Sequence, residues 1–546
     1  MKKKIFQLLA GCGLMAVAGC VHQDHQSVKR SASLRPNILL IVADDLNYDS
    51  PGFAGGVAPD VTPNLDRLAQ EGLSFKLGFT PVSVCQPARQ SMLTGVYPHN
   101  YGSGGFFPMA EGVPTLPATL AENGYLTANI HKVHHMQPME SFGWTFTNQE
   151  LGLTDPDGVV GRDPAAFAAG LRRLIDEADQ QNKSFFMVAN SADTHRPFHG
   201  DTIPWSEGYF WGENPVDIPE PSRIYAQEEV RVPPPLPDLP GIREDLAKYA
   251  SSLRRLDDTV GACLNVLKET GREHSTLVIF VSDNGMPLPY AKFDCFLGSN
   301  RIPFVMRWPE VIRPGIDAEH MVSLIDLTPT ILELAGLPSF SKTDGYSLVQ
   351  LMKGEAPDEW RRGIVSLRNE DINYGVFVRL MLRKQPDFLE YLDQAGFVER
   401  PDHKEAGTYT RSKQTRCYFD GRFGYIYNDW YDPDGLKKSR YGAGVPGGDP
   451  SMLVMKAAAK TNAAVKARYE SFLLRSLEEF YDWDRDPGTY HNLIDHPEVQ
   501  KQVMAARQGL LEWMNVSGDP LLPDYLKRLG EDGVRLENEA MEVKSK

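Results

Sequence analysis

The sequence predicts an α/β protein built around an open, mostly parallel sheet, and three apolar runs are the main reason. Residues 37–43, 185–189 and 276–281 are almost entirely apolar, as is typical of parallel strands that are buried on both faces. Helical patterns separate these runs, so strands and helices alternate along the chain. The helical patterns cover residues 63–72, 117–123, 163–180 and 242–270. Open sheets of this kind bind ligands at the carboxyl ends of their strands.

Polar side chains follow each of the three predicted strands. Asp44 and Asp45 come after the first strand and Asp283 and Asn284 after the third, while His195 lies a few residues beyond the second. Two adjacent carboxylates can share one site only where the strand ends and the backbone turns. A hard divalent cation is the simplest reason to tolerate their repulsion. Acids at the start of a loop are common, so a purely structural role is the alternative.

A cysteine precedes a predicted helix in the motif Cys85-Gln86-Pro87-Ala88-Arg89. Pro87 suits the first turn of a helix, where a missing N–H costs little. Cys85 is therefore expected at the electropositive start of the helix, with Arg89 one turn further on and facing the same way. This arrangement predicts an anion site with a nucleophile in it. A buried structural cysteine is the alternative.

Charge and cysteine content exclude several classes of function. The formal net charge of the 546-residue chain is -15, so we do not expect it to bind nucleic acid through a basic surface. An anionic substrate must instead be held by a local cluster of cations or by a metal. The chain has 6 cysteines, which are too few and too scattered for a disulfide scaffold or a zinc site.

The N-terminus has the pattern of a bacterial export signal. Lysines at positions 2–4 precede an apolar stretch over residues 5–19 that is too short for a membrane span. The stretch ends at Val17-Ala18-Gly19-Cys20, which resembles a lipobox with Cys20 as the lipidated first residue. A similar motif that ends at Cys12 would leave too short an apolar region. We therefore expect a signal peptide over residues 1–19, a tether over 20–35, and a lipoprotein of the periplasm or outer membrane in a bacterial cell envelope. Secretion without lipid is the alternative.

The length of the chain exceeds one ordinary domain, so a large domain and a smaller one are expected. We place the catalytic domain at residues 36–360, because proline and glycine become frequent beyond it. Residues 361–525 are expected to form a C-terminal subdomain. An aromatic segment at 418–431 with a turn inside it indicates a small antiparallel sheet there. A charged tail is expected over residues 526–546.

The segment from Val84 to Gly95 resembles the signature of the sulfatase family, C-x-P-x-R followed by T-G. The resemblance extends over roughly residues 36 to 515. It implies an alkaline-phosphatase-like fold, in which helices sandwich a mostly parallel sheet and a smaller α+β domain follows. It also implies that Cys85 is converted to formylglycine by a formylglycine-generating or anaerobic sulfatase-maturating enzyme. The nucleophile would then be a hydroxyl of the hydrated aldehyde.

The same resemblance assigns the strand-end acids to one Ca²⁺ ion. Sulfatases carry A-D-D and S-D-N-G motifs in this chain order, which match residues 43–45 and 282–285. The implied ligands are the side chains of Asp44, Asp45, Asp283 and Asn284, together with that of residue 85. The choice of calcium over magnesium follows from the family and not from the spacing.

A histidine-rich segment, Ile130-His131-Lys132-Val133-His134-His135, resembles the family element G-K-x-H, with His131 in place of the glycine. By this resemblance Lys132 holds the sulfate and the side chain of residue 85. His134 would act as the base in the step that frees the sulfate. His135 is a rival for that role.

Two further basic positions match the family. His195 belongs to an H-x-P element, which implies a sulfate ligand and a candidate acid. Lys292 occupies the second basic position, near the leaving oxygen. With Arg89 and Lys132 these residues supply the local cations that an acidic chain needs to hold an anion.

Within the family, several segments look closest to heparan N-sulfatase (sulfamidase). They are residues 283–289, 193–196 and 98–102. Lys292 stands where sulfamidase has an arginine, and Gln86 and Gln90 are unusual within the signature. The expected substrate is therefore a sulfated saccharide that carries either an N-sulfate or an O-sulfate. A phosphate or phosphonate ester hydrolase of the same superfamily and an inactive glycan-binding lipoprotein are the alternatives.

Overall fold

The computed structural model describes residues 35–105, 107–153, 159–201, 218–369, 414–431 and 450–530, together with 532, 533 and 535. The expected signal peptide, the lipobox with Cys20, Cys12 and nearly all of the tether lie outside the described residues, as does the tail from residue 536. Within the described part of the chain, no helix has the length and apolar character needed to cross a membrane.

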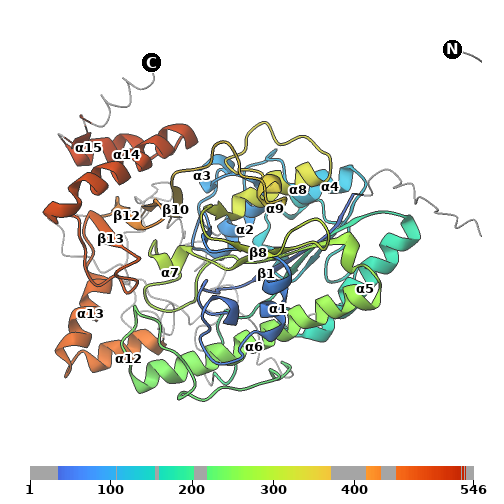
Figure 1. Ribbon diagram of the computed structural model, residues 1–546, viewed down its shortest axis with the longest axis horizontal. Coiled ribbons are helices and arrows are strands. Elements are labelled where there is room, and N and C mark those ends of the chain that lie inside the picture. The colour runs from blue at the N-terminus through green and yellow to red at the C-terminus, as the bar shows by residue number, and fades with distance from the viewer. Residues whose placement is uncertain are drawn as a thin grey trace, which may run out of the picture. The chain divides into compact units, whose positions relative to one another are not determined.

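A seven-stranded sheet lies at the centre of the larger layered region (Figure 1). In spatial order its strands are β4 (Leu126–Ile130), β5 (Phe185–Asn190), β1 (Asn37–Ala43), β6 (Thr276–Ser282), β7 (Phe304–Arg307), β2 (Leu73–Phe75) and β8 (Gly315–Asp317). The first four of these run parallel, and β7 is antiparallel to both of its neighbours. The predicted mostly parallel sheet is confirmed, and the three predicted strands are β1, β5 and β6.

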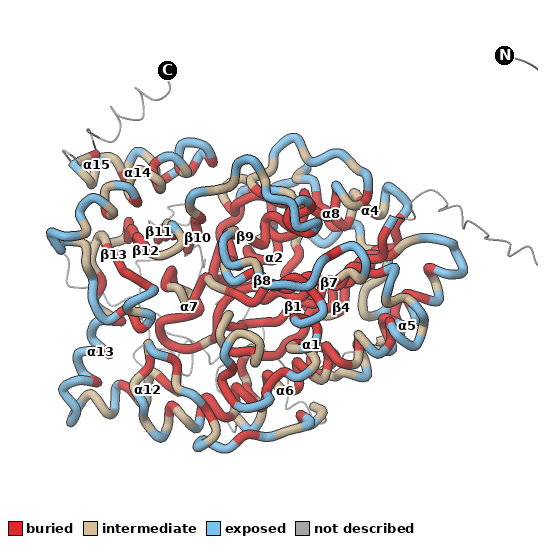
Figure 2. The backbone as a smooth tube through the Cα atoms, viewed as in Figure 1, coloured by how far each residue is buried: buried red, intermediate tan, exposed pale blue. Residues whose placement is uncertain are grey.

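Helices cover both faces of this sheet, because successive side chains of each strand point to opposite sides. On one face lie α1 (Pro63–Glu71), α5 (Pro164–Gln181) and α6 (Pro240–Glu269). On the other lie α2 (Cys85–Thr94), α4 (Leu116–Glu122) and α8 (Leu327–Leu334). Leu39 and Ile41 of β1 belong to the first core, and Ile38 and Leu40 belong to the second. The central strands β1, β5 and β6 are buried throughout their length, whereas the edge strand β8 is largely exposed (Figure 2).

A second, antiparallel sheet forms near the C-terminus. It consists of β10 (Ile364–Asn369), β11 (Gln414–Phe419), β12 (Phe423–Asn428) and β13 (Glu478–Asp482). The helices of this region are α12 (Pro450–Ala458), α13 (Ala463–Leu473), α14 (Gln500–Ser517) and α15 (Leu522–Leu529). Gly421, in the turn between β11 and β12, has a φ of 104°, which favours glycine. The predicted small antiparallel sheet is therefore confirmed.

Short elements complete the described chain. They are the short 3-10 helices η1 (Gly52–Ala54), η2 (Val133–His135), η3 (Met139–Phe142), η4 (Val160–Arg162), η6 (Glu273–Ser275), η7 (Leu324–Asp326) and η8 (Pro497–Val499), the strands β3 (Gly78–Phe79) and β9 (Val322–Ser323), and the α-helices α3 (Pro98–Tyr101), α7 (Leu297–Asn300) and α9 (Val349–Met352). The division of the chain near residue 360 stays a prediction. The expected tail begins too early, because α15 continues to Leu529 and packs with the second sheet.

Candidate active site

Four polar residues meet where β1 and β6 end side by side. Ala43 and Ser282 are partners in the parallel pairing of these strands, so the residues that follow them are neighbours. The Asp45 backbone N–H donates to Asp283 Oδ1 over 3.1 Å, and the Asn284 amide donates to Asp45 Oδ1 over 2.7 Å. Asp45 has a φ of 68°, so the backbone turns sharply after the strand. The turn lets both Asp45 and the preceding aspartate face one site.

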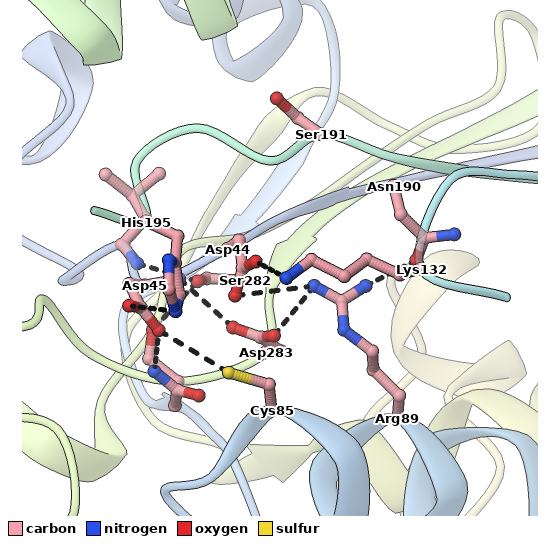
Figure 3. Close-up of polar contacts among 12 residues, drawn as sticks. Asp44, Asp45, Cys85, Arg89, Lys132, Asn190, Ser191, His195, Ser282 and Asp283 are labelled. Carbon is pink, nitrogen blue, oxygen red and sulfur yellow. Dashed lines mark hydrogen bonds and ion pairs between the residues drawn. The ribbon is translucent and has the colours of Figure 1, made fainter. Parts of the chain in front are cut away.

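Cys85 is the first residue of α2 and faces these carboxyl groups (Figure 3). Its Sγ lies 3.8 Å from Asp45 Oδ1. One turn further on, Arg89 donates from Nη2 to Asp283 Oδ2 over 2.7 Å, and the same nitrogen lies 3.7 Å from Asp44 Oδ1. Burial raises the pKa of the Cys85 thiol well above its ordinary value, so the unmodified side chain stays protonated at neutral pH.

Lys132 reaches the same carboxyl groups from the segment between β4 and η2. Its Nζ lies 2.5 Å from Asp44 Oδ2. Burial raises the pKa of Asp44, but Lys132, His195 and Arg89 outweigh it and hold that pKa well below its ordinary value. His131 and Lys132 have φ values of 58° and 51°, in the region that favours glycine. Glycine is also what the resemblance leads us to expect at position 131.

Lys292 contacts Cys85 directly. Its Nζ lies 3.0 Å from Cys85 Sγ and 2.6 Å from Asp45 Oδ1. Burial alone would lower the pKa of Lys292, but the surrounding acidic groups, with Asp45 the foremost of them, together outweigh burial and raise this pKa. The ammonium group therefore stays charged beside residue 85.

Histidines occupy two sides of this cluster. His195 Nε2 lies 3.9 Å from Asp45 Oδ2, and burial lowers the pKa of His195 to about 4. His134 and His135 lie on η2, with ring centroids 4.4 Å apart. Burial lowers the pKa of His134 to about 4 and that of His135 well below its ordinary value. His134 is partly exposed as a residue, whereas His135 is buried.

Asn190 is a site residue that the sequence pattern did not reveal. It is the last residue of β5, and its Oδ1 accepts a hydrogen bond from Arg89 Nη1. Its Nδ2 donates to the Ile130 carbonyl and to Asn129 Oδ1, both over 2.9 Å. Asn190 therefore joins Arg89 to the end of β4. Its place directly after the apolar run 185–189 is the signal that could have identified it.

The acidic cluster has the composition and spacing of a metal site. One ligand atom from each of Asp44, Asp45, Cys85 and Asp283 lies within 4.8 Å of the others, and all four residues are buried. Within the described part of the chain, Asp44 Oδ1 and the Asn284 side-chain oxygen have no hydrogen-bond donor. Burial raises the pKa of Asp283 to about 7. Carboxylate and amide oxygens are the ligands that Ca²⁺ and Mg²⁺ prefer, so these residues fit a hard divalent cation.

Comparison with known proteins places the chain among sulfatases. The family model described as Sulfatase matches residues 36–337. Human N-sulphoglucosamine sulphohydrolase is 32% identical over 314 residues. The aligned part covers 55% of this chain, and it spans only 61% of the length of that protein. The ulvan-active sulfatase of Formosa agariphila is 24% identical over 520 residues, which cover 89% of this chain and 76% of that protein.

Solved structures share the fold. A putative sulfatase from Bacteroides thetaiotaomicron matches with a TM-score of 0.58 at 17% identity, over 89% of this chain and 93% of its own. Phosphonate monoester hydrolase of Agrobacterium radiobacter matches with a TM-score of 0.60 at 18% identity, over 88% of this chain and 96% of that protein's chain. At these identities the likeness concerns the fold alone. The family model, in contrast, covers more than half of the sequence, and the chain therefore belongs to the sulfatase family.

Proposed function

We propose that this protein hydrolyses sulfate groups of sulfated saccharides, with residue 85 as the nucleophile after its conversion to formylglycine. One observation carries the proposal: Arg89, Lys132 and Lys292 come from three separate segments and converge on the carboxyl groups beside Cys85. In a chain with a net charge of -15, these buried cations would form an anion site once the carboxyl groups hold a divalent cation. Membership of the sulfatase family supports sulfate as that anion.

The state of Cys85 favours modification over attack by a thiolate. A buried thiol with a raised pKa is a weak nucleophile. Formylglycine would supply a hydroxyl of its hydrated aldehyde at the electropositive start of α2. We propose a formylglycine-generating or anaerobic sulfatase-maturating enzyme as the partner that installs it.

We assign one divalent cation, proposed to be Ca²⁺, to the strand-end cluster. The side chains that would hold it are those of Asp44, Asp45, Asp283, Asn284 and residue 85. When bound, the ion would polarise a sulfate oxygen and help to orient residue 85. Asp44 Oδ1 and Asn284 Oδ1, which accept no hydrogen bond from the described residues, support this assignment.

Arg89 and Lys132 bind the sulfuryl oxygens as negative charge spreads over them. Arg89 is fixed by Asp283 at 2.7 Å, and Lys132 is fixed by Asp44 at 2.5 Å. Both cations are therefore oriented before the substrate arrives, so little reorganisation is needed during the reaction.

Proton transfer falls to Lys292, His195 and His134. Lys292 holds a proton 3.0 Å from the side chain of residue 85, where it can pass to the leaving oxygen or nitrogen. His195 is the second candidate for this role, but it would first have to take up a proton, because burial lowers its pKa to about 4 and leaves it neutral at neutral pH. His134 is neutral at neutral pH because burial lowers its pKa to about 4. It can therefore accept the proton that residue 85 gives up when the sulfate is freed.

The substrate class that we propose is a sulfated glycan, and two bonds are candidates for cleavage. An N-sulfate of glucosamine is supported by the relative named N-sulphoglucosamine sulphohydrolase, which is 32% identical to this chain. An O-sulfate of a different polysaccharide is the second candidate, and the ulvan-active sulfatase, which aligns over 89% of the chain, supports a polysaccharide substrate. A panel of defined N-sulfated and O-sulfated saccharides would distinguish them.

We also propose that the protein is exported to a bacterial cell envelope and carries lipid on Cys20, with residues 20–35 as a tether. The pattern of residues 2–20 supports this proposal. Metabolic labelling with a radioactive fatty acid tests it. Label should enter the wild-type chain and not Cys20→Ala, and equal labelling of both would contradict it.

Release of sulfate from 4-nitrophenyl sulfate by protein purified from its native host tests the activity, with 4-nitrophenyl phosphate measured in parallel. Faster release of phosphate would establish the alternative of a phosphate ester hydrolase. Peptide mass spectrometry of the same sample reports the state of residue 85. A wholly unmodified Cys85 together with no turnover would establish the inactive, glycan-binding alternative.

A further inference from the structure

The segment that carries Lys292 has a strained backbone. Tyr290 and Phe293 have φ values of 65° and 64°, in a region that bulky side chains rarely adopt. Such conformations persist only where surrounding contacts impose them. Lys292 lies between these two residues, is buried, and places its Nζ 3.0 Å from Cys85 Sγ. The contacts that hold this segment therefore also place Lys292.

Two of these contacts come from beyond the first sheet, and the stronger one is a buried ion triad. Arg475 Nη1 lies 3.1 Å and 3.0 Å from the two carboxylate oxygens of Asp294, two residues after Lys292. Glu479 of β13 holds the other side of the guanidinium, with Nε–Oε1 at 2.6 Å and Nη2–Oε2 at 2.7 Å. The three side chains are at most 2% exposed. A planar guanidinium can bridge two carboxylates in this way, whereas the ammonium group of a lysine cannot.

The second contact comes from α13. The Tyr290 hydroxyl donates to the Arg468 carbonyl over 2.6 Å. The Arg468 guanidinium stacks on the same ring, with its central carbon 3.5 Å from the ring centroid. Tyr290 and Asp294 lie on either side of Lys292, so the C-terminal region holds the strained segment at both ends.

The segment is also joined to the residues that lead into Cys85. The Ser83 hydroxyl donates to the Asp294 carbonyl, and the Phe293 N–H donates to the Ser83 carbonyl over 3.2 Å. A displacement of Asp294 would therefore change the position of Lys292 relative to residue 85.

We propose that Arg475 is a positioning residue that holds Lys292 against residue 85, so that the C-terminal sheet helps to set the rate at which the leaving group departs. This inference rests on the proposed function, in which Lys292 acts at the leaving atom. Arg475 touches Asp294 and Glu479, and it acts through the strained segment.

The test measures kcat/KM of Arg475→Met with aryl sulfates whose leaving groups range from 4-nitrophenol to phenol. Displacement of Lys292 should cost most where the leaving group is poor, because the proton matters most there. We expect a loss of roughly 100-fold for phenyl sulfate and of less than about tenfold for 4-nitrophenyl sulfate, mainly in kcat. The double variant with Lys292→Met should be no slower than Lys292→Met alone.

Arg416→Met is the matched control. Arg416 is buried in β11 of the second sheet and pairs with Asp519 at 2.6 Å. Its hydrogen bonds go to Asp519 and to residues of β10 and β11. Arg416→Met should lower the free energy of unfolding. The ratio of its kcat/KM for phenyl sulfate to its kcat/KM for 4-nitrophenyl sulfate should stay at the wild-type value. If Arg475→Met keeps that ratio as well, the positioning role is wrong.

Asp294→Asn replaces Arg475→Met if the latter does not fold, since it keeps the shape of the side chain and removes its charge. A crystal structure of whichever variant folds should show Lys292 Nζ beyond hydrogen-bond distance of Asp45. An unmoved Lys292 overturns the inference. If the wild-type enzyme releases no sulfate from any aryl sulfate or from any member of the panel of sulfated saccharides, the proposed function is wrong, and the crystal structure alone decides the positioning role.

Discussion

Replacement of Asn190 by leucine removes the link between Arg89 and the end of β4 while it keeps the size of the side chain. Asn190 is fully buried, accepts from Arg89 Nη1 and donates to the Ile130 carbonyl over 2.9 Å. A hydrogen bond to a charged group contributes about 1.5 to 3 kcal/mol, and a buried carbonyl left without a donor costs about 1 to 3 kcal/mol. We therefore expect Asn190→Leu to lower the free energy of unfolding by about 2.5 to 6 kcal/mol.

The effect of the same substitution on the reaction should be smaller. Arg89 keeps its contact with Asp283 at 2.7 Å, so the charge remains in the site and only its orientation loosens. We expect kcat/KM for 4-nitrophenyl sulfate to fall roughly tenfold, because a misplaced cation stabilises the transition state less well.

Urea unfolding followed by intrinsic fluorescence measures the change in stability. Thr330→Val is a matched control, since Thr330 is buried in α8, donates to the Asp326 carbonyl over 2.6 Å and accepts from the Leu348 N–H over 2.9 Å. It should destabilise the fold and leave kcat/KM unchanged. A loss of less than about 1 kcal/mol for Asn190→Leu would refute the reasoning, because it would mean that water or a neighbour replaces these bonds without cost.

Three other perturbations test separate parts of the molecule. Asp257 is buried beneath the start of α1, and burial raises its pKa from 3.8 to about 6. The native state therefore binds more protons than the unfolded chain between these values, so the free energy of unfolding should fall by about 3 kcal/mol as the pH rises through them. Asp257→Asn should remove this part of the pH dependence when the free energy of unfolding is measured by urea titration at several pH values. If the free energy of unfolding of Asp257→Asn changes with pH as steeply as that of the wild type, the raised pKa of Asp257 is contradicted. Arg255→Met breaks the buried pair with Asp193 at 2.7 Å, two residues before His195, and should cost about 3 to 5 kcal/mol; an unaltered urea midpoint would argue against this. Chelation of divalent cations should lower the melting temperature, and Ca²⁺ at roughly 100 times its dissociation constant should restore about 3 kcal/mol; no response to Ca²⁺ would exclude a calcium site.

The acids at the strand ends could be predicted because the rule that places them is local. An apolar run that stops at Asp44, and another that stops before Asp283, identify two strand ends. The rule that ligands gather at the carboxyl ends of parallel strands then brings these residues to one edge. The motif at Cys85 could be interpreted for the same reason, since the helix start and the turn spacing of Arg89 are properties of adjacent residues.

The residues that hold the site from outside could not be predicted in this way. Arg89 and Asn190 are 101 positions apart, and Arg475 and Asp294 are 181 positions apart. No periodicity or spacing distinguishes Arg475 from other arginines, because its partners are set by how the second sheet packs against the segment after β6. Asn190 was missed by one position, since the predicted strand ended at Ala189. The lipobox at Cys20 stays a prediction.

The charges fixed in the site are close to balance, and this bears on how an anion is attracted. The three carboxyl groups at the strand ends face three cations, one on α2, one before η2 and one after β6. His134 and His195 add no charge at neutral pH, because burial lowers the pKa of each to about 4. A sulfate group therefore meets little net positive charge from the side chains, in a chain whose net charge is -15. A divalent cation held by the carboxyl groups would tip the balance toward positive charge. The carboxyl groups thus favour anion binding indirectly, by holding the metal, while the cations hold the carboxyl groups in place.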